Sequence, residues 1–347
     1  MYSEALQKRL DTLWESELPF VVYRLPESQE IVIYYQKDNQ LNITHNFSNS
    51  GFVMASFANS DNHPFIPNSK TELFQKPNPQ IFDTKPIFFS ENYETKKQFI
   101  NLVKLAKEEI AQRTLQKVVI SRTIDFDSAK NPQALFLALE NIYPNTLAYL
   151  WHHPLVGTWL GATPEKFIET SSMQTQTMAL AGTQVYNPNK VPKWSRKEIE
   201  EQALVTQQVL FDLKTLFKDD EIHYGEPISK RAGNLVHICT HFTLPKLNTS
   251  LEKLVTTLHP TPAVGGVPKS EAKKFILNNE SHDRLFYSGF LGSITTKKTN
   301  LFVNLRCAEW NAGQLRLYVG AGITLSSDPE SEWLETQRKA ETLARIL

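Results

Sequence analysis

The stretch TLAYLWHHPLVGTWLGATPEKFIETSSMQTQTMALAGT, residues 146–183, carries the clearest information on the fold class. It consists of blocks rich in Leu, Tyr, Trp and Thr that are separated by short Pro-, Gly- and Ser-containing segments, a composition typical of strands and turns. Strands that follow one another through short turns pair antiparallel, because a parallel pair needs a crossover of a dozen or more residues. The stretch therefore favours antiparallel sheets over a doubly wound parallel sheet.

Further strand-like blocks lie on both sides of this stretch and alternate with helical patterns. The blocks are KVVISRTIDF (117–126), NLVHICTHF (234–242), SGFLGSITT (288–296), LFVNLRCAEW (301–310) and LRLYVGAGITL (315–325). Apolar residues at helical spacing predict a helix within residues 1–20 and another from Tyr93 to about Ile110. VVYRLPESQEIVIYYQ (21–36) predicts two strands around a Pro-Glu-Ser turn. Together these patterns predict an α+β fold of layered antiparallel sheets flanked by helices.

Residues from about Asn59 to Pro86 differ from the rest of the chain in composition. They are rich in Asn, Pro, Ser and Asp, as in NSDNHPFIPNSK and QKPNPQIFDTKP. Such a composition predicts a long loop or linker. This segment is the best candidate for a boundary in the chain.

Two later helices have clear start signals. Ser195 is followed three residues later by Glu198, the pattern of a capping box. Asp328 and Pro329 supply an N-cap and a proline at the first helical position. We therefore predict helices that begin directly after Ser195 and Asp328.

These two helices also carry acidic side chains at informative positions. Glu201 lies four residues before Val205 and so extends an apolar row, which predicts that its carboxylate points towards the protein. Glu332, Glu335 and Lys339 are spaced i, i+3, i+7 and share one helix face. Acids in a first helical turn and an i, i+4 Glu–Lys pair are also common without any function.

The overall composition excludes several classes of protein. The 347 residues include 37 Lys and Arg against 37 Asp and Glu, and this balance argues against a large nucleic-acid-binding surface. The two cysteines cannot form a disulfide framework. Neither a signal peptide nor a membrane-spanning run is expected, so we predict a cytoplasmic globular protein with no membrane partner.

Common short motifs of catalysis are absent. The sequence has no GxGxxG, Walker loop or GxSxG elbow. His237 and His241 have the spacing of the HExxH histidines, but the Glu is missing and the segment is strand-like. We therefore expect these two histidines to be structural rather than functional.

Several motifs instead match a known family, and they occur in the family's order. The most specific are HPTPAVGG (259–266) and GAGI…SDPESEWLET…K, which runs from Gly320 to Lys339. From about Tyr93 to Leu347 the chain resembles the chorismate-utilising enzymes, which include isochorismate, salicylate, anthranilate and aminodeoxychorismate synthases. The resemblance implies the chorismate-binding-enzyme fold. It also implies a catalytic core at residues 91–347 and a variable part at residues 1–90 that packs on the same core.

Within this family the motifs are most similar to those of isochorismate synthase, an isomerase that moves a hydroxyl from C4 of chorismate to C2 with water as nucleophile. By resemblance, Lys117 is the general base that activates the water, and Glu165 is the general acid that protonates the departing C4 hydroxyl. Hydroxide is a poor leaving group, so an acid on that side lowers the barrier. Nitrogen-using relatives have another residue where Lys117 stands, which favours water as the attacking group.

The resemblance also implies a magnesium site and a substrate site. The implied Mg²⁺ ligands are Glu201, Glu332 and Glu335, whose oxygen donors suit this ion. Arg306 and Lys339 match positions that bind the carboxylates of chorismate. Arg306 is expected on the strand face of Phe302 and Asn304. The other residues that match the substrate site are Gly182, His259, Ala263, Gly320 and Gly322.

Two alternatives to isochorismate synthase stay open. Salicylate synthase shares the first step and then eliminates pyruvate; Ala263, where nitrogen-using relatives tend to have Thr, favours isochorismate synthase without excluding lyase activity. A non-catalytic chorismate-binding homologue would be expected to lose Lys117 or Glu165, and both are present. Two positions depart from the family pattern, Gln202 in place of His and Thr163 in place of Ser. Relatives of this type act as single chains, so we expect a monomer that feeds menaquinone or siderophore synthesis.

Overall fold

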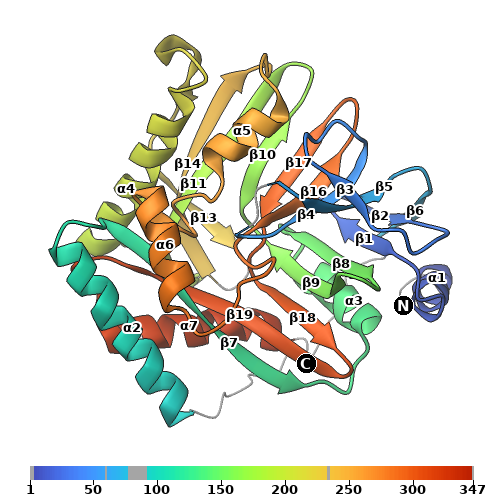
Figure 1. The fold of residues 1–347 in the computed structure, drawn as a ribbon, viewed down its shortest axis with the longest axis horizontal. Helices are drawn as coiled ribbons and strands as arrows, with labels where there is room; N and C mark the ends of the chain where they lie inside the picture. The colour runs from blue at the N-terminus through green and yellow to red at the C-terminus, as the bar shows by residue number, and fades with distance from the viewer. Residues whose placement is uncertain (1–3, 59–60, 77–91, 233–234, 346–347) are drawn as a thin grey trace.

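The computed structural model describes residues 4–58, 61–76, 92–232 and 235–345. In this part of the chain the strands form two large sheets, and every pairing within them is antiparallel (Figure 1). The order of the first sheet is β15 (Gly266–Val267), β7 (Lys117–Asp127), β19 (Gln314–Ile323), β18 (Cys307–Asn311), β9 (Gly157–Thr163), β8 (Leu147–His153), β1 (Phe20–Arg24), β2 (Glu30–Tyr35) and β6 (Thr71–Gln75). The order of the second sheet is β12 (His223–Tyr224), β14 (Leu235–Pro245), β11 (Gln174–Val185), β10 (Lys166–Thr170), β17 (Thr299–Val303), β16 (Phe290–Ile294), β4 (Gly51–Ala55), β5 (His63–Pro67) and β3 (Asn42–Thr44), with β13 (Ile228–Ala232) also paired to β14. The predicted α+β fold with antiparallel sheets is confirmed.

Helices cover the outer faces of the two sheets (Figure 1). The helices against the first sheet are α1 (Glu4–Glu15) and α3 (Pro132–Ile142) near β8 and β9, with α2 (Tyr93–Ala111), α6 (Lys269–Asn279) and α7 (Pro329–Ala344) near β7 and β19. Those against the second sheet are α4 (Arg196–Leu213) and α5 (Leu251–Leu258). A 3₁₀ turn at Asp219–Glu221 follows α4. None of the helices in the described residues is long and apolar enough to cross a membrane.

The inner faces of the two sheets pack together through large aromatic side chains. Trp151 and Trp159 of the first sheet are fully buried there, and the ring centroid of Trp151 lies 6.3 Å from that of Phe52 in the second sheet. The Trp159 ring also stacks on Tyr318, with centroids 5.3 Å apart. Burial of such large apolar surfaces is the main favourable term that joins the sheets. This core is continuous with the pocket described below, because Tyr318 also lines that pocket.

The chain passes between the two sheets several times, and two of these crossings are short and lie next to each other. The first crossing joins β9 to β10 through Pro164 and Glu165, and the second joins β17 to β18 through residues 304–306. The two crossings are hydrogen-bonded side by side: the N–H of Val303 donates to the carbonyl of Glu165 over 2.9 Å, and that of Ala162 donates to the carbonyl of Arg306 over 3.1 Å. Residues far apart in the sequence thereby meet at the junction of the sheets.

The predicted helix starts are confirmed by their hydrogen bonds. Ser195 and Glu198 form a reciprocal capping box at the start of α4. The Asp328 side chain accepts from the backbone N–H of Ser331 at the start of α7, with Pro329 at the first helical position. The predicted helix at the N-terminus and the predicted hairpin at residues 21–36 are also present, as α1 and β1–β2.

Two local expectations are wrong. Part of the expected loop at residues 59–86 is structured, because β5 and β6 fall within it, while residues 59–60 and 77–91 lie outside the described residues. Phe65 and Ile66 are buried in β5 although prolines flank them, whereas β6 is a half-exposed edge strand. Edge and terminal strand positions tolerate proline and polar side chains, so composition hid both strands. Arg306 is not on a strand: β17 ends at Val303, and Arg306 has a positive φ of 50° at the crossing.

Strands from the first 90 residues belong to both sheets. β1, β2 and β6 extend the first sheet, and β3, β4 and β5 extend the second. The division into residues 1–90 and 91–347 stays a prediction.

Candidate functional site

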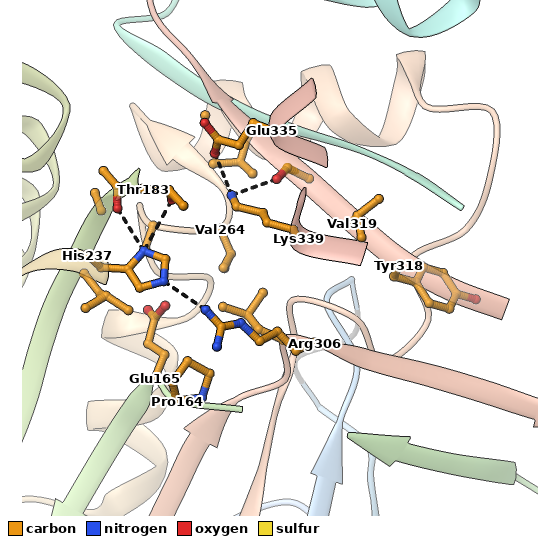
Figure 2. A pocket seen from close by; sticks show the side chains of 18 of the residues that line it. Pro164, Glu165, Thr183, His237, Val264, Arg306, Tyr318, Val319, Glu335 and Lys339 are labelled. Carbon is orange, nitrogen blue, oxygen red and sulfur yellow. Dashed lines mark hydrogen bonds and ion pairs between the residues drawn. The ribbon is translucent and has the colours of Figure 1, made fainter. Parts of the chain in front are cut away.

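A pocket with about 800 Å³ of space between its lining atoms, part of it open to solvent, lies beside the two crossings. Nine of the twelve predicted site residues line it: Glu165, Gly182, Glu201, Ala263, Arg306, Gly320, Gly322, Glu335 and Lys339. They come from both crossings, from β11 and β19, from the segment before β15, and from α4 and α7. Figure 2 shows Glu165, His237 and Arg306 grouped together, with Lys339 and Glu335 across from them.

Glu165 is a buried carboxyl group with an unused oxygen. It is 2% exposed, and its Oε1 has no hydrogen-bond partner among the described residues. Burial raises the pKa of Glu165 to about 8, although the positive charges of Lys117, Lys230, Lys339 and Arg306 oppose that rise. At neutral pH the group therefore holds its proton and can donate it to a molecule in the pocket.

Arg306 is held at the second crossing by its neighbours. Its Nη1 donates to the carbonyl of Ala232 over 2.9 Å, and its Nη2 donates to Nε2 of His237 over 3.0 Å. Burial lowers the pKa of Arg306 to about 10, so the guanidinium stays charged at neutral pH. This leaves a fixed positive charge that lines the pocket next to Glu165.

His237 is the functional candidate that sequence reasoning missed. Its Nδ1 lies 2.8 Å from the carbonyl of Gly182 and 3.3 Å from Oγ1 of Thr183, so Nδ1–H donates while Nε2 accepts from Arg306. Burial, helped by the charge of Arg306, lowers the pKa of His237 to about 3, which keeps the ring neutral and able to accept. His241 is exposed and does not line the pocket. No local motif marks His237, because its partners are 55 and 69 residues away in the sequence.

A second positive charge lies on α7. Nζ of Lys339 is 2.8 Å from Oε1 of Glu335 and donates to the carbonyl of Gly320 over 2.9 Å (Figure 2). Burial lowers the pKa of Lys339, but Glu335 and Glu201 outweigh that effect and raise it overall. Lys339 therefore carries a positive charge when a ligand binds in the pocket.

Lys117 lies behind the pocket lining. It is fully buried at the start of β7, and its Nζ is 3.1 Å from Oε1 of Glu201 on α4. Gly322 makes room for this pair, because a Cβ at that position would overlap Oε1 of Glu201 and lie 3.2 Å from Cε of Lys117. The predicted inward orientation of Glu201 is thus confirmed, and the glycine is required by the side chains packed against it.

Glu332 has a lysine partner of its own. It is 1% exposed and forms an ion pair with Nζ of Lys197, which lies one helical turn before Glu201 on α4. Burial lowers the pKa of Lys197, but Glu332, Glu335 and Glu201 together raise it overall. All three predicted metal ligands therefore lie within electrostatic reach of one ammonium group.

The three glutamates fit a divalent cation by their chemistry, but each now faces a lysine. Carboxylate oxygens are the donors that Mg²⁺ prefers. In the described residues, no three acidic, histidine or cysteine side chains are positioned together to hold a metal ion. Glu201 faces Lys117, Glu332 faces Lys197, and Glu335 faces Lys339. A metal ion at this place would have to draw carboxylates away from these lysines.

His259 is not brought to the pocket. Its ring packs edge-on against Phe290, with centroids 5.2 Å apart, and it is absent from the lining. Burial lowers the pKa of His259 to about 3. Its role in substrate binding stays a prediction that this placement does not support.

The two departures from the family pattern have visible partners. The buried amide of Gln202 donates to the carbonyl of Ala179 over 3.0 Å and so ties α4 to β11, away from the glutamates. The Thr163 hydroxyl donates to the carbonyl of Val303 over 2.5 Å, and a serine hydroxyl could do the same. Neither residue lines the pocket.

Comparison with known proteins identifies the family of this chain. The family model described as "Chorismate binding enzyme" matches residues 32–347. Isochorismate synthase MenF of Escherichia coli (strain K12) is 29% identical over 267 residues, which cover 74% of this chain and 62% of that protein. Isochorismate synthase EntC of the same strain is 29% identical over 314 residues, covering 82% of this chain and 79% of that protein. In fold, DhbC from Bacillus anthracis has a TM-score of 0.81 at 24% identity, over 97% of this chain and 98% of that one. The chain therefore belongs to the chorismate-binding enzyme family.

Proposed function

We propose that this protein is an isochorismate synthase. The observation that carries the proposal is Glu165, a protonated buried carboxyl group with a free oxygen in a pocket that also presents Arg306 and Lys339. An acid on one side and a lysine within electrostatic reach on the other are what an exchange of hydroxyl groups needs. The relatives named isochorismate synthase support this activity.

The two cations of the pocket suit a substrate with two carboxylates, as chorismate has. The Arg306 guanidinium is fixed by Ala232 and His237, so little ordering remains to be done when it binds an anion. Lys339 supplies a second charge from α7. We expect these donors to orient the ring with C4 at Glu165 and with C2 on the side of Lys117, which lies behind the pocket lining.

The chemical step is a substitution with movement of the ring double bonds. Lys117 is paired with Glu201 in the resting site, so it acts as a base only after it has released a proton to solvent; the amine then removes a proton from water as the water oxygen bonds to C2. Glu165 gives its proton to the C4 hydroxyl, which leaves as water, and the double bonds shift to compensate. One water enters and one leaves, so chorismate and isochorismate are isomers.

We further propose that Glu201, Glu332 and Glu335 bind Mg²⁺. When bound, the ion neutralises the ring carboxylate of chorismate and helps to position it. We expect the enzyme to act as a cytoplasmic monomer and its product to serve menaquinone or siderophore synthesis.

The decisive assay is incubation of the protein with chorismate and Mg²⁺, followed by chromatographic separation of the products. We expect isochorismate alone. Salicylate with pyruvate would indicate salicylate synthase instead, and no turnover would indicate a chorismate-binding protein without catalysis. Omission of Mg²⁺ with a chelator should stop turnover, and unchanged turnover would contradict the magnesium site.

We predict that His237→Phe raises KM for chorismate by roughly tenfold or more, with a smaller change in kcat, because Arg306 loses the acceptor that orients it. Steady-state kinetics separate the two parameters. His241→Phe is the matched control, since it makes the same change on the same strand outside the pocket. Equal effects of the two substitutions on KM would show that His237 does not position Arg306.

A further inference from the structure

Lys197 is a lysine beside the predicted metal ligands that the proposed reaction leaves without a task. Lys117 is assigned to the water and Lys339 to a carboxylate, whereas Lys197 lines no part of the pocket. Its Nζ nevertheless lies within electrostatic reach of Glu201, Glu332 and Glu335, and its hydrogen bond is to Glu332. Its ammonium group thus pairs with Glu332 and offsets part of the negative charge of the other two carboxylates.

The charges around the glutamates are already balanced. Three carboxylates face three ammonium groups, those of Lys117, Lys197 and Lys339. Adding a divalent cation to a neutral, largely buried group of charges is strongly unfavourable unless a positive charge leaves, because charges interact over short distances in a medium of low dielectric. When no chorismate is present to supply negative charge, binding of Mg²⁺ therefore requires that at least one lysine moves away.

Of the three lysines, Lys197 is the one that can move at least cost. The Lys117 side chain is 1% exposed, and Lys339 is also bound to the carbonyl of Gly320. The Lys197 side chain is 28% exposed, and its hydrogen bond in the described residues is to Glu332 alone. A lysine stem is long and flexible, so the ammonium can turn to solvent once Glu332 has another partner.

We propose that Lys197 is an internal counter-ion that stabilises the metal-free acidic cluster and competes with Mg²⁺ for Glu332. This inference rests on the magnesium site of the proposed function. The competition sets the affinity of the site for the divalent ion. It also keeps Glu332 paired whenever the ion is absent, which avoids an uncompensated buried charge.

The test compares Lys197→Gln with the wild type by calorimetric titration of Mg²⁺ alone, without chorismate. Loss of the competing ammonium should tighten Mg²⁺ binding by roughly tenfold. When a chelator keeps both proteins free of metal, the melting temperature of the variant should be about 5 °C below that of the wild type. At saturating Mg²⁺ the two melting temperatures should be equal. Arg196→Gln is the matched control, because it removes one positive charge from the same helical turn but from an exposed pair with Glu200.

Equal or weaker Mg²⁺ binding by Lys197→Gln would overturn the proposal. If the variant does not fold, the wild type provides a second test by trace acetylation and peptide mass spectrometry. Mg²⁺ should raise the acetylation of Lys197 relative to Lys214, which lies in an exposed pair with Asp219. An unchanged ratio contradicts the release of Lys197. Turnover that does not depend on Mg²⁺ would contradict the magnesium site itself, whereas Mg²⁺-dependent turnover with unchanged affinity in Lys197→Gln contradicts only the role of Lys197.

Discussion

Replacing Glu165 with glutamine is expected to lower kcat for chorismate by about 10²- to 10⁴-fold, because the variant keeps the shape of the side chain but cannot donate a proton. The fold should persist, since glutamine is neutral and Glu165 is already protonated in the folded protein at neutral pH. Rates of isochorismate formation and thermal melting check the two parts. Glu169→Gln is the control: it lies on β10, the strand that begins directly after Glu165, but is paired with Lys166 and Lys298 outside the pocket.

The same residue gives a dependence on pH. The pKa of Glu165 is raised from its ordinary value of 4.5 to about 8 by burial, so the acid form is present below about pH 8 and is lost above it. We expect kcat/KM to fall as pH rises through that value. Stability from this group is full below pH 4.5 and declines as pH rises towards 8, because the folded state holds the proton that the unfolded state releases. In Glu165→Gln, both the fall of kcat/KM and the fall of stability with rising pH should disappear. If kcat/KM of the variant still fell at the same alkaline pH, another group would be the acid.

Replacing Lys117 with alanine is expected to cost a similar factor, about 10²- to 10⁴-fold in kcat, because no base remains to take the proton of the attacking water. The substitution removes a fully buried side chain and leaves space beside Glu201. Added methylamine should enter that space and restore part of the activity in a concentration-dependent way. If Lys117 acts as a base, only an amine should restore activity. If Lys117 only balances the charge of Glu201, potassium or sodium ions should restore activity as well as the amine does.

The matched control for this variant is Lys269→Ala. Lys269 also pairs with a carboxylate, Asp212, at 3.2 Å, but it lies outside the pocket lining. It should lose stability without a loss of kcat comparable to that of Lys117→Ala. If Lys117→Ala kept full activity, Lys117 would not be the base of the reaction. That result would not contradict the role of Glu165 as the acid.

Local sequence signals predicted the secondary structure well where the signals act over a few residues. The capping residues Ser195 and Asp328 mark helix starts correctly, because a cap is made with backbone groups two or three residues away. The antiparallel class followed from short connections between strands. Composition did not predict β5 and β6. These polar or proline-containing segments are strands because they pair with strands from elsewhere in the chain.

The site was predicted unevenly, and the errors have a common cause. Family motifs placed Glu165, Arg306 and Lys339 together, and they do line one pocket. The strand-like pattern predicts a structural His237 and the family motif predicts His259 in the pocket, but the fold places only His237 at the pocket. Whether a buried histidine faces a pocket or a phenylalanine depends on contacts that no local pattern records.

The amino-acid order alone was enough for the antiparallel α+β class, the capped helices and the acidic rows on α4 and α7, since these depend on neighbours within one or two turns. The three-dimensional packing was needed to bring Glu165 and Arg306 to adjacent crossings between the sheets and to set a lysine against each glutamate. The physical reason is that burial and charge pairing, which fix protonation and hydrogen bonding, arise between residues that only the folded chain brings into contact.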